Sequence, residues 1–175
     1  MTMTLVVLGI AMLVTVGFTG LCSFNPGKPE NGPVREVDSA SFLQMEAQRA
    51  DYPVREPETP QGWQPNSVRA GMADGHITTI LGFVTANGDY VHALQTAAPL
   101  DSMPADGKAR VDDGTVDVDG VTWVKKEGVE PNTRRTWVAD LGDSRVLLEG
   151  SANDDEYREL AKAMQDAPIV EKHTN

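Results

Sequence analysis

The chain begins with a long apolar segment and continues as a mixture of polar and apolar residues. Most side chains between Leu5 and Phe24 are apolar, and no Asp, Glu, Lys or Arg occurs before Lys28. About 20 helical residues, at about 1.5 Å each, cross the roughly 30 Å hydrocarbon core of a bilayer. We therefore expect a transmembrane anchor over residues 1–24. Because the next segment is rich in Pro and Gly, we expect an extended linker over residues 25–37.

Other kinds of leader are less consistent with this segment. A cleaved signal peptide needs small residues at its cleavage site, and none is well placed between Gly17 and Ser23. A lipoprotein would modify Cys22, but the preceding Leu21 is large for that motif. A buried helix of a soluble domain would carry a polar face, which this segment lacks. A single-pass anchor explains the pattern best.

The charges that follow the anchor bear on its orientation. Lys28 and Arg35 come after the apolar segment, which weakly favours a cytoplasmic position for the rest of the chain. A signal-anchor ahead of one long domain nevertheless normally exports that domain, since long domains translocate largely regardless of charge. We therefore expect the domain on the extracytoplasmic side of the cell membrane.

Two later segments have apolar residues at helical spacing. Residues 39–51 offer Ser39 or Ser41 as a helix cap, and their apolar positions are Phe42, Leu43, Met45, Ala47 and Ala50. Residues 151–167 offer Ser151 or Asn153 as a cap, and their apolar stripe is Tyr157, Leu160, Ala161 and Met164. Acidic residues in the first turn of the second segment suit the helix dipole. We expect one helix in each segment.

The sequence between these helices contains strand-forming runs joined by turns. In residues 77–98, Asn87-Gly88 suits a two-residue type I′ turn, which would place Phe83 opposite His92. Asp119-Gly120 predicts a second hairpin, and residues 141–144 predict the turn of a third. The expected class is α+β: an N-terminal transmembrane helix followed by an antiparallel sheet of about six strands flanked by two helices. The domain is expected over residues 38–167, with a flexible tail over residues 168–175.

Composition narrows the classes of partner. The formal net charge is −11 and the pI is about 4.6. An acidic domain repels phosphate backbones, so we expect no nucleic-acid partner. Anionic head groups would repel it too, so contact with membrane lipids is expected through the N-terminal helix. The single cysteine, Cys22, excludes a disulfide framework and a cysteine-based metal cluster.

No residue pattern indicates a catalytic, metal or cofactor site. His76, His92 and His173 share no ligand spacing, and His92 has no identifiable nucleophile or orienting partner, so we interpret it as a cross-strand packing residue. The aspartates at 112, 113, 117 and 119 lack the ligand spacing of a calcium loop. No Gly-rich phosphate loop, GxSxG elbow or HExxH sequence occurs. We expect a non-catalytic protein without a cofactor.

Aromatic residues are the remaining candidates for recognition. A ligand or partner surface would draw on Trp63, Phe83, Tyr90, His92 and Trp137. The simpler interpretation, which we favour, is that the tryptophans form the core of a small sheet, since each buries a large area.

Several short motifs together resemble one family. They are Tyr52-Pro53-Val54, Pro60-Gln61-Gly62-Trp63, Leu81-Gly82-Phe83-Val84-Thr85 with Gly88-Asp89-Tyr90-Val91, Gly120-Val121-Thr122-Trp123, and Glu159-Leu160-Ala161. The chain resembles the actinobacterial membrane-anchored family catalogued as domain of unknown function 4245. The resemblance implies an exported, tethered domain in an actinobacterium, and it implies no catalytic residues.

The predicted anchor, the small tethered domain and the lack of catalytic motifs lead to one main hypothesis. We expect an accessory or interaction subunit of a larger membrane complex, for example a respiratory assembly, with another integral membrane protein as its partner. The alternative is an envelope binding module that holds a lipid or small molecule between the sheet and a helix.

Overall fold

The computed structural model describes Val6, residues 39–104 and residues 106–172. The described domain belongs to a compact unit over Glu36–Asn175. The predicted anchor, apart from Val6, and the predicted linker lie outside the described residues. Among the described residues, no helix is long and apolar enough to cross a membrane.

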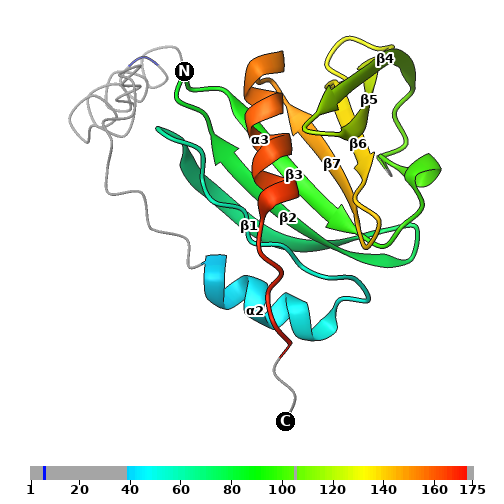
Figure 1. Ribbon diagram of the computed structural model, residues 1–175. Helices are drawn as coiled ribbons and strands as arrows, with labels where there is room; N and C mark the ends of the chain where they lie inside the picture. Colours follow the sequence, from blue (N-terminus) through cyan, green and yellow to red (C-terminus); the bar gives the residue numbers. More distant parts are fainter. Residues whose placement is uncertain (1–5, 7–38, 105, 173–175) are drawn as a thin grey trace. The chain divides into compact units, whose positions relative to one another are not determined.

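The domain is built on one antiparallel sheet of seven strands (Figure 1). The strands are β1 Gln64–Ala73, β2 His76–Val84, β3 Tyr90–Thr96, β4 Arg110–Val118, β5 Val121–Gly128, β6 Thr136–Asp140 and β7 Arg145–Gly150. Their order across the sheet is β1-β2-β3-β7-β6-β5-β4, so β7 joins the first three strands to the next three. The predicted α+β class with an antiparallel sheet and two helices is confirmed, with seven strands instead of about six.

The strand missing from the prediction is β1, at one edge of the sheet. Its sequence, QPNSVRAGMA, contains Pro65 and Gly71 and few β-branched residues, so its own strand propensity is weak. It forms because Asp74 and Gly75, both with positive φ, turn the chain so that β1 pairs with β2 along its length. This Asp-Gly turn is the clearest local signal for the strand.

The turn between β2 and β3 has a different length from the predicted one. Its loop has three residues, Ala86 to Gly88, and the Thr85 N–H closes it by donating to the Asp89 carbonyl at 2.8 Å. Within this loop only Gly88 has a positive φ. A type I turn followed by a bulge has these features, whereas a type I′ turn needs two residues with positive φ.

The longer loop shifts the pairing of β2 with β3 by one residue. His92 lies opposite Gly82, not opposite Phe83 as predicted, so the predicted register is wrong. A shift of one residue moves each side chain to the other face relative to its partner strand. Phe83 and His92 therefore lie on opposite faces of the sheet.

The other two predicted turns are confirmed. Asp119 and Gly120 both have positive φ and connect β4 to β5, where Val118 pairs with Val121. Residues 141–144 connect β6 to β7 and are closed by a backbone hydrogen bond of 2.9 Å. In both cases the local sequence defines the turn, and the strand pairing follows from it.

Both described α-helices lie on the same face of the sheet, which we call the helix face (Figure 1). They are α2, Ser39–Arg49, and α3, Asp154–Asp166. Tyr52, just after α2, hydrogen-bonds to Thr79 of β2 at 2.8 Å. Trp137 of β6 packs against Tyr157 of α3, with ring centroids 5.2 Å apart. Residues that lie opposite one another on paired strands point to the same face of a sheet. The pairing across β2, β3, β7 and β6 therefore places Thr79 and Trp137 on one face.

The helix face holds the main hydrophobic core. Trp123, Trp137, Leu148 and Leu160 are each 0 % exposed. The apolar stripe predicted for the second helix is confirmed, since its four residues are all buried on α3. Each buried aromatic side chain removes about 150–250 Å² from water, so these residues contribute much of the folding free energy.

The buried stripe of α2 differs from its apolar sequence positions. Leu43, Glu46 and Ala47 are buried, whereas Met45 is 50 % exposed. The Glu46 carboxylate pairs with Arg49 at 3.0 Å, which provides one partner for this buried acid. Met45 is thus an exposed methionine on the helix side of the domain.

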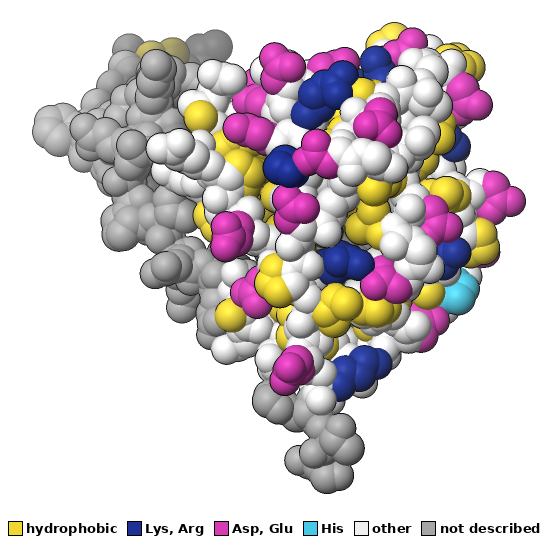
Figure 2. Space-filling view, viewed as in Figure 1, with side chains coloured by type: hydrophobic (Ala, Val, Ile, Leu, Met, Phe, Trp, Pro, Cys, Tyr) yellow, Lys and Arg dark blue, Asp and Glu magenta, His cyan; other side chains and the backbone are white. Residues whose placement is uncertain are grey.

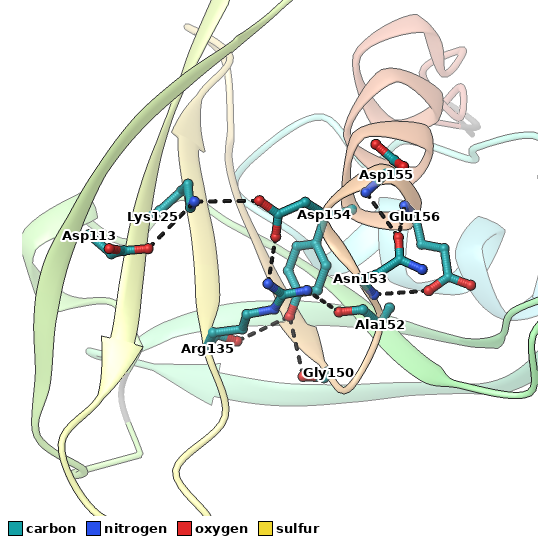
Figure 3. A network of polar contacts seen from close by, with 10 residues as sticks. Asp113, Lys125, Arg135, Gly150, Ala152, Asn153, Asp154, Asp155 and Glu156 are labelled. Atoms are coloured by element: carbon teal, nitrogen blue, oxygen red, sulfur yellow. Dashed lines mark hydrogen bonds and ion pairs between the residues drawn. The ribbon is translucent and has the colours of Figure 1, made fainter.

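A polar network fixes the start of α3 (Figure 3). The Asn153 side chain accepts hydrogen bonds from the N–H groups of Asp155 and Glu156. The Glu156 carboxylate accepts one from the Asn153 N–H in return, which makes a capping box. Asp154 pairs with Arg135, just before β6. These contacts tie the first turn of the helix to the sheet, and they confirm Asn153 as the cap.

Residues 168–172, predicted to belong to a flexible tail, are hydrogen-bonded to the domain. Ile169 forms a β-bridge with Arg55, and the Val170 N–H donates to the Val54 carbonyl at 2.8 Å. The chain after α3 therefore runs beside the segment that follows α2, and in this respect it differs from the prediction.

The opposite face of the sheet, which we call the open face, has neither described α-helix on it. The short 3₁₀ helix η1, Leu100–Ser102, and the residues after it cover part of this face. Met103 is 3 % exposed and packs with Val138 and Leu147 in a second, smaller cluster. Arg69 is exposed on this face, and Ile80 and Leu94 beside it are partly exposed.

Candidate binding groove on the open face

Side chains on the open face form two rows across the strands. One row runs through Arg69, Ile80, Leu94, Leu147, Val138 and Val124. The neighbouring row runs through Ser67, Gly82, His92, Glu149, Thr136 and Lys126. Residues two positions apart on a strand point to the same face, so the two rows lie side by side. The sheet thus places a mainly apolar strip directly beside a polar strip.

A groove of about 270 Å³ opens where these rows meet the loop after β3. Its polar lining comes from Arg69, His92, Asp106 and Glu149. Leu94, Leu147, Met103 and Met72 contribute to its apolar lining. The groove therefore combines charged groups with an apolar surface, which is the usual composition of a binding site.

His92 is the buried polar group of the groove. It is 9 % exposed, and its Nδ1 atom has no hydrogen-bond partner among the described residues. Burial, together with the positive charges of Arg69 and Arg134, lowers the pKa of the imidazole to about 4. The ring is therefore neutral near pH 7, and either nitrogen can donate or accept a hydrogen bond, depending on the tautomer.

The Tyr90 side chain lies over Gly82, beside His92. A Cβ atom at Gly82 would lie 2.5 Å from Tyr90 Oη and 2.4 Å from Ser67 Oγ. The rings of Tyr90 and His92 have centroids 6.0 Å apart, and the Arg134 guanidinium lies 5.8 Å from the Tyr90 ring centroid. The phenol thus takes the space that a side chain at position 82 would occupy.

Arg110 braces the acidic groups of the groove. Its side chain is 3 % exposed and forms two hydrogen bonds with the Asp106 carboxylate, at 2.8 and 2.9 Å. It also donates to Glu149 at 3.2 Å and to the Arg134 carbonyl at 3.0 Å. The hydrogen bond from Arg110 lowers the pKa of Asp106, whereas burial raises the pKa of Glu149. The donors of Arg110 are used within the protein, so its role is structural.

Ser67, His92 and Glu149 share the polar row, but they do not form a catalytic triad. Gly82 separates Ser67 from His92, and within the described residues no hydrogen bond links any two of the three. A serine nucleophile needs its base within about 3 Å. The arrangement instead offers hydrogen bonds and ion pairs beside an apolar strip, which is suited to binding.

The residues predicted for a recognition surface are divided between the two faces. Trp63, Phe83 and Trp137 lie on the helix face, where they are 7 %, 4 % and 0 % exposed. The Trp63 and Phe83 rings pack edge to face, with centroids 6.3 Å apart. Tyr90 and His92 lie together on the open face.

Sequence reasoning missed Arg69, Arg110 and Glu149 as members of this site. Arg69 belongs to the weakly predicted edge strand, and Arg110 begins a strand after an irregular loop. Glu149 lies in a predicted strand, but only the observed pairing of β3 with β7 places it opposite His92. A charged residue at the end of an otherwise apolar strand is the only local signal for it.

The other hollows are less suited to a specific ligand. The cavity between α2 and the sheet, lined in part by Leu43, Leu81 and Phe83, has a volume of about 130 Å³. Small-molecule sites typically measure about 300–1,000 Å³. A hollow of about 500 Å³ beside α3 has both polar and apolar lining, and its one basic residue, Lys162, already pairs with Asp119 and Asp166. No group of three or more His, Cys, Asp or Glu in the described residues could hold a metal ion.

The profile of one protein family matches residues 1–164, which is most of the chain; its description is protein of unknown function (DUF4245). The chain belongs to the DUF4245 family. This confirms the resemblance found in the sequence motifs, while the membrane anchoring and actinobacterial origin that it implies remain predictions. The DUF4245 match begins in the predicted anchor and ends at Met164 in α3, so it includes every residue of the groove. No curated protein and no solved structure matches the chain.

Proposed function

We propose that this DUF4245 protein is a non-catalytic accessory subunit that binds another protein through the open face of its sheet. The observation that carries the proposal is the position of α2 and α3 on one face, with a charged and apolar groove on the other. The partner would be an integral membrane protein or complex, met outside the cytoplasm where residues 1–24 anchor the chain.

The composition of the groove region supports a protein partner. The buried centres of protein interfaces are enriched in Tyr, Met and Arg. Arg69, Met72 and Met103 line the groove, and Tyr90 and Arg134 lie beside His92. Leu94, which also lines the groove, is partly exposed, so a partner that covers the groove would bury this apolar side chain further.

The alternative, an envelope module for a lipid or small molecule, has less support. It would use the space between the sheet and a helix, and the cavity found there measures about 130 Å³. A space of that size is below the usual range for ligand sites and too small for a lipid chain.

The proposal is tested by photo-crosslinking in native membranes with p-benzoylphenylalanine at one of two positions. Leu94 lines the groove on the open face and is partly exposed, whereas Met45 lies on α2 and is 50 % exposed. We expect the Leu94→p-benzoylphenylalanine protein to form one discrete adduct with a membrane protein. The Met45→p-benzoylphenylalanine protein should form none, because the helix side is not the interface.

Native mass analysis after gentle detergent extraction gives an independent measurement. The unmodified full-length protein should migrate with a partner. Equal adducts from both positions, or extraction only as a free monomer, would contradict the proposal.

A further inference from the structure

The basic side chains of the domain differ between the two sides of the sheet. On the helix side, shown in Figure 2, Lys and Arg lie among Asp and Glu. Arg49 pairs there with Glu46, Arg135 with Asp154, and Lys162 with Asp119. Within residues 39–104 and 106–172, the basic side chains without an ion pair or hydrogen bond are Arg69, Lys108, Lys126 and Arg134.

These four unpaired residues lie on or beside the open face. Arg69 and Lys126 stand at opposite ends of its two rows of side chains. Arg134 packs against an open-face tyrosine, and Lys108 comes two residues after Asp106 of the groove. The whole chain has 26 acidic and 15 basic residues, yet these four basic side chains, none with an ion pair among the described residues, all lie at the face that has the groove.

The acids of the groove offset this charge only in part, since Arg134 and Lys108 act on the Glu149 carboxylate without forming an ion pair with it. Asp106 and Glu149 are both bound by Arg110, whose guanidinium lies between them. Arg69 has no carboxylate partner among the described residues, although it lines the groove. His92 adds a second unused group, because its Nδ1 is buried and unpartnered there.

We propose that the groove docks an acidic peptide segment of the partner protein. Carboxylates of the segment pair with Arg69 and Arg134, one of them also accepts a hydrogen bond from His92, and an apolar side chain packs on Leu94 and Pro104, which are partly exposed. This inference rests on the proposed function and names the chemistry that its partner must present.

A peptide fits the groove better than the other sources of negative charge. At about 270 Å³ the groove is small for a free metabolite but has room for one or two side chains. An anionic bilayer would repel a chain of net charge −11, and a concave site with a buried imidazole does not match a flat surface.

Binding is measured by fluorescence anisotropy with the full-length protein in a non-ionic detergent. The probes are labelled, capped hexapeptides in which Leu alternates with Glu, Gln or Lys. We expect the Glu peptide to bind about tenfold more tightly than the Gln peptide, and the Lys peptide to bind most weakly. Raising the salt from about 50 mM to about 500 mM should weaken the Glu peptide only, because its contacts are ion pairs.

Arginine variants locate the site. The double variant Arg69→Gln, Arg134→Gln should lose about tenfold in affinity for the Glu peptide, since it removes two ion pairs of up to about 1 kcal/mol each. Arg69→Lys with Arg134→Lys keeps both charges and should retain most of the binding. The matched control, Arg49→Gln with Arg158→Gln, removes the same charge from the helix side and should change the affinity by less than about twofold.

Several results would overturn the inference. These are equal affinity for the Glu and Gln peptides, no binding of the Glu peptide at about 1 mM, or an equal loss in the helix-side control. Binding to phosphatidylglycerol vesicles, lost in the Arg69→Gln, Arg134→Gln protein and without Glu-peptide binding, would assign the surface to a membrane instead. If the crosslink from position 94 persists in that double variant, the proposed function stands and only the acidic-segment assignment fails.

Discussion

The helix face and the open face belong to one sheet, yet their side chains do different things. On the helix face, Trp123, Trp137 and Leu148 are fully buried beneath α2 and α3, and the outer surface of that side carries charges of both signs (Figure 2). On the open face, a mainly apolar row lies beside a polar row, and Arg69 and Arg134 have no carboxylate partner among the described residues. The helix face holds the main hydrophobic core, whereas the open face holds a smaller cluster and keeps charged side chains without ion pairs among the described residues.

The difference arises from what covers each face. Alternation along a strand gives every strand two kinds of side chain, but it does not say which face will be buried. Here α3 follows β7 directly and packs on one face, so the polar row that contains His92 and Glu149 stays on the other.

The largest expected effect is on the helix face. Trp137→Ala should lower the free energy of unfolding by about 3–5 kcal/mol, because a fully buried ring packed on Tyr157 is lost. Trp137→Phe should cost less, since the indole Nε1 has no hydrogen-bond partner among the described residues. Denaturant unfolding of the full-length protein measures both. If Trp137→Ala were as stable as the unmodified protein, the main hydrophobic core could not lie on the helix face.

A second pair of substitutions compares glycines on the two faces. Gly150→Ala should cost about 1–3 kcal/mol, because its Cβ would lie 2.1 Å from the backbone oxygen of Tyr90. Gly82→Ala should cost less, because its Cβ meets only the ends of the Ser67 and Tyr90 side chains, which can rotate. Thermal unfolding of the two variants measures which of them loses more stability. A larger loss for Gly82→Ala than for Gly150→Ala would contradict this packing.

His92, on the open face, makes the free energy of unfolding depend on pH. The imidazole pKa falls from 6.5 to about 4 on folding, so the unfolded chain binds the proton more tightly. The contribution is therefore fully present above about pH 6.5 and is lost as the pH falls toward about 4. Between pH 7 and pH 5 we expect a loss of about 2 kcal/mol.

His92→Gln isolates this contribution from that of other titrating groups. The variant should lose less stability than the unmodified protein between the same two pH values, as measured by urea unfolding. An identical pH dependence of the two proteins would show that His92 is not buried as a neutral ring.

The smallest effect is expected at an exposed arginine of the open face. Arg69→Gln should change the free energy of unfolding by less than about 0.5 kcal/mol, because the side chain has no ion pair in the described structure. Arg55→Gln should cost about 1–2 kcal/mol, since Arg55 is 12 % exposed and holds Asp143 at 2.9 Å. A larger loss at Arg69 than at Arg55 would mean that the open face is needed for folding.

Local sequence by itself determined several parts of this domain. The turn at Asp119-Gly120, the Asn153 cap and the stripe of α3 were all predictable, because each depends on residues a few positions apart. The α+β class follows from the same short-range patterns. Of the residues that line the groove, the sequence indicated only His92, and Tyr90 beside it was another of the five candidates.

Only the tertiary structure decided the rest. The three-residue loop at Ala86–Gly88 set the register, the weak β1 strand formed by pairing with β2, and β7 inserted between β3 and β6. This loop length and these strand pairings placed Arg69 and Glu149 on the same face as His92. They depend on pairing between segments far apart in the chain, whose free energy is not contained in any short stretch of sequence.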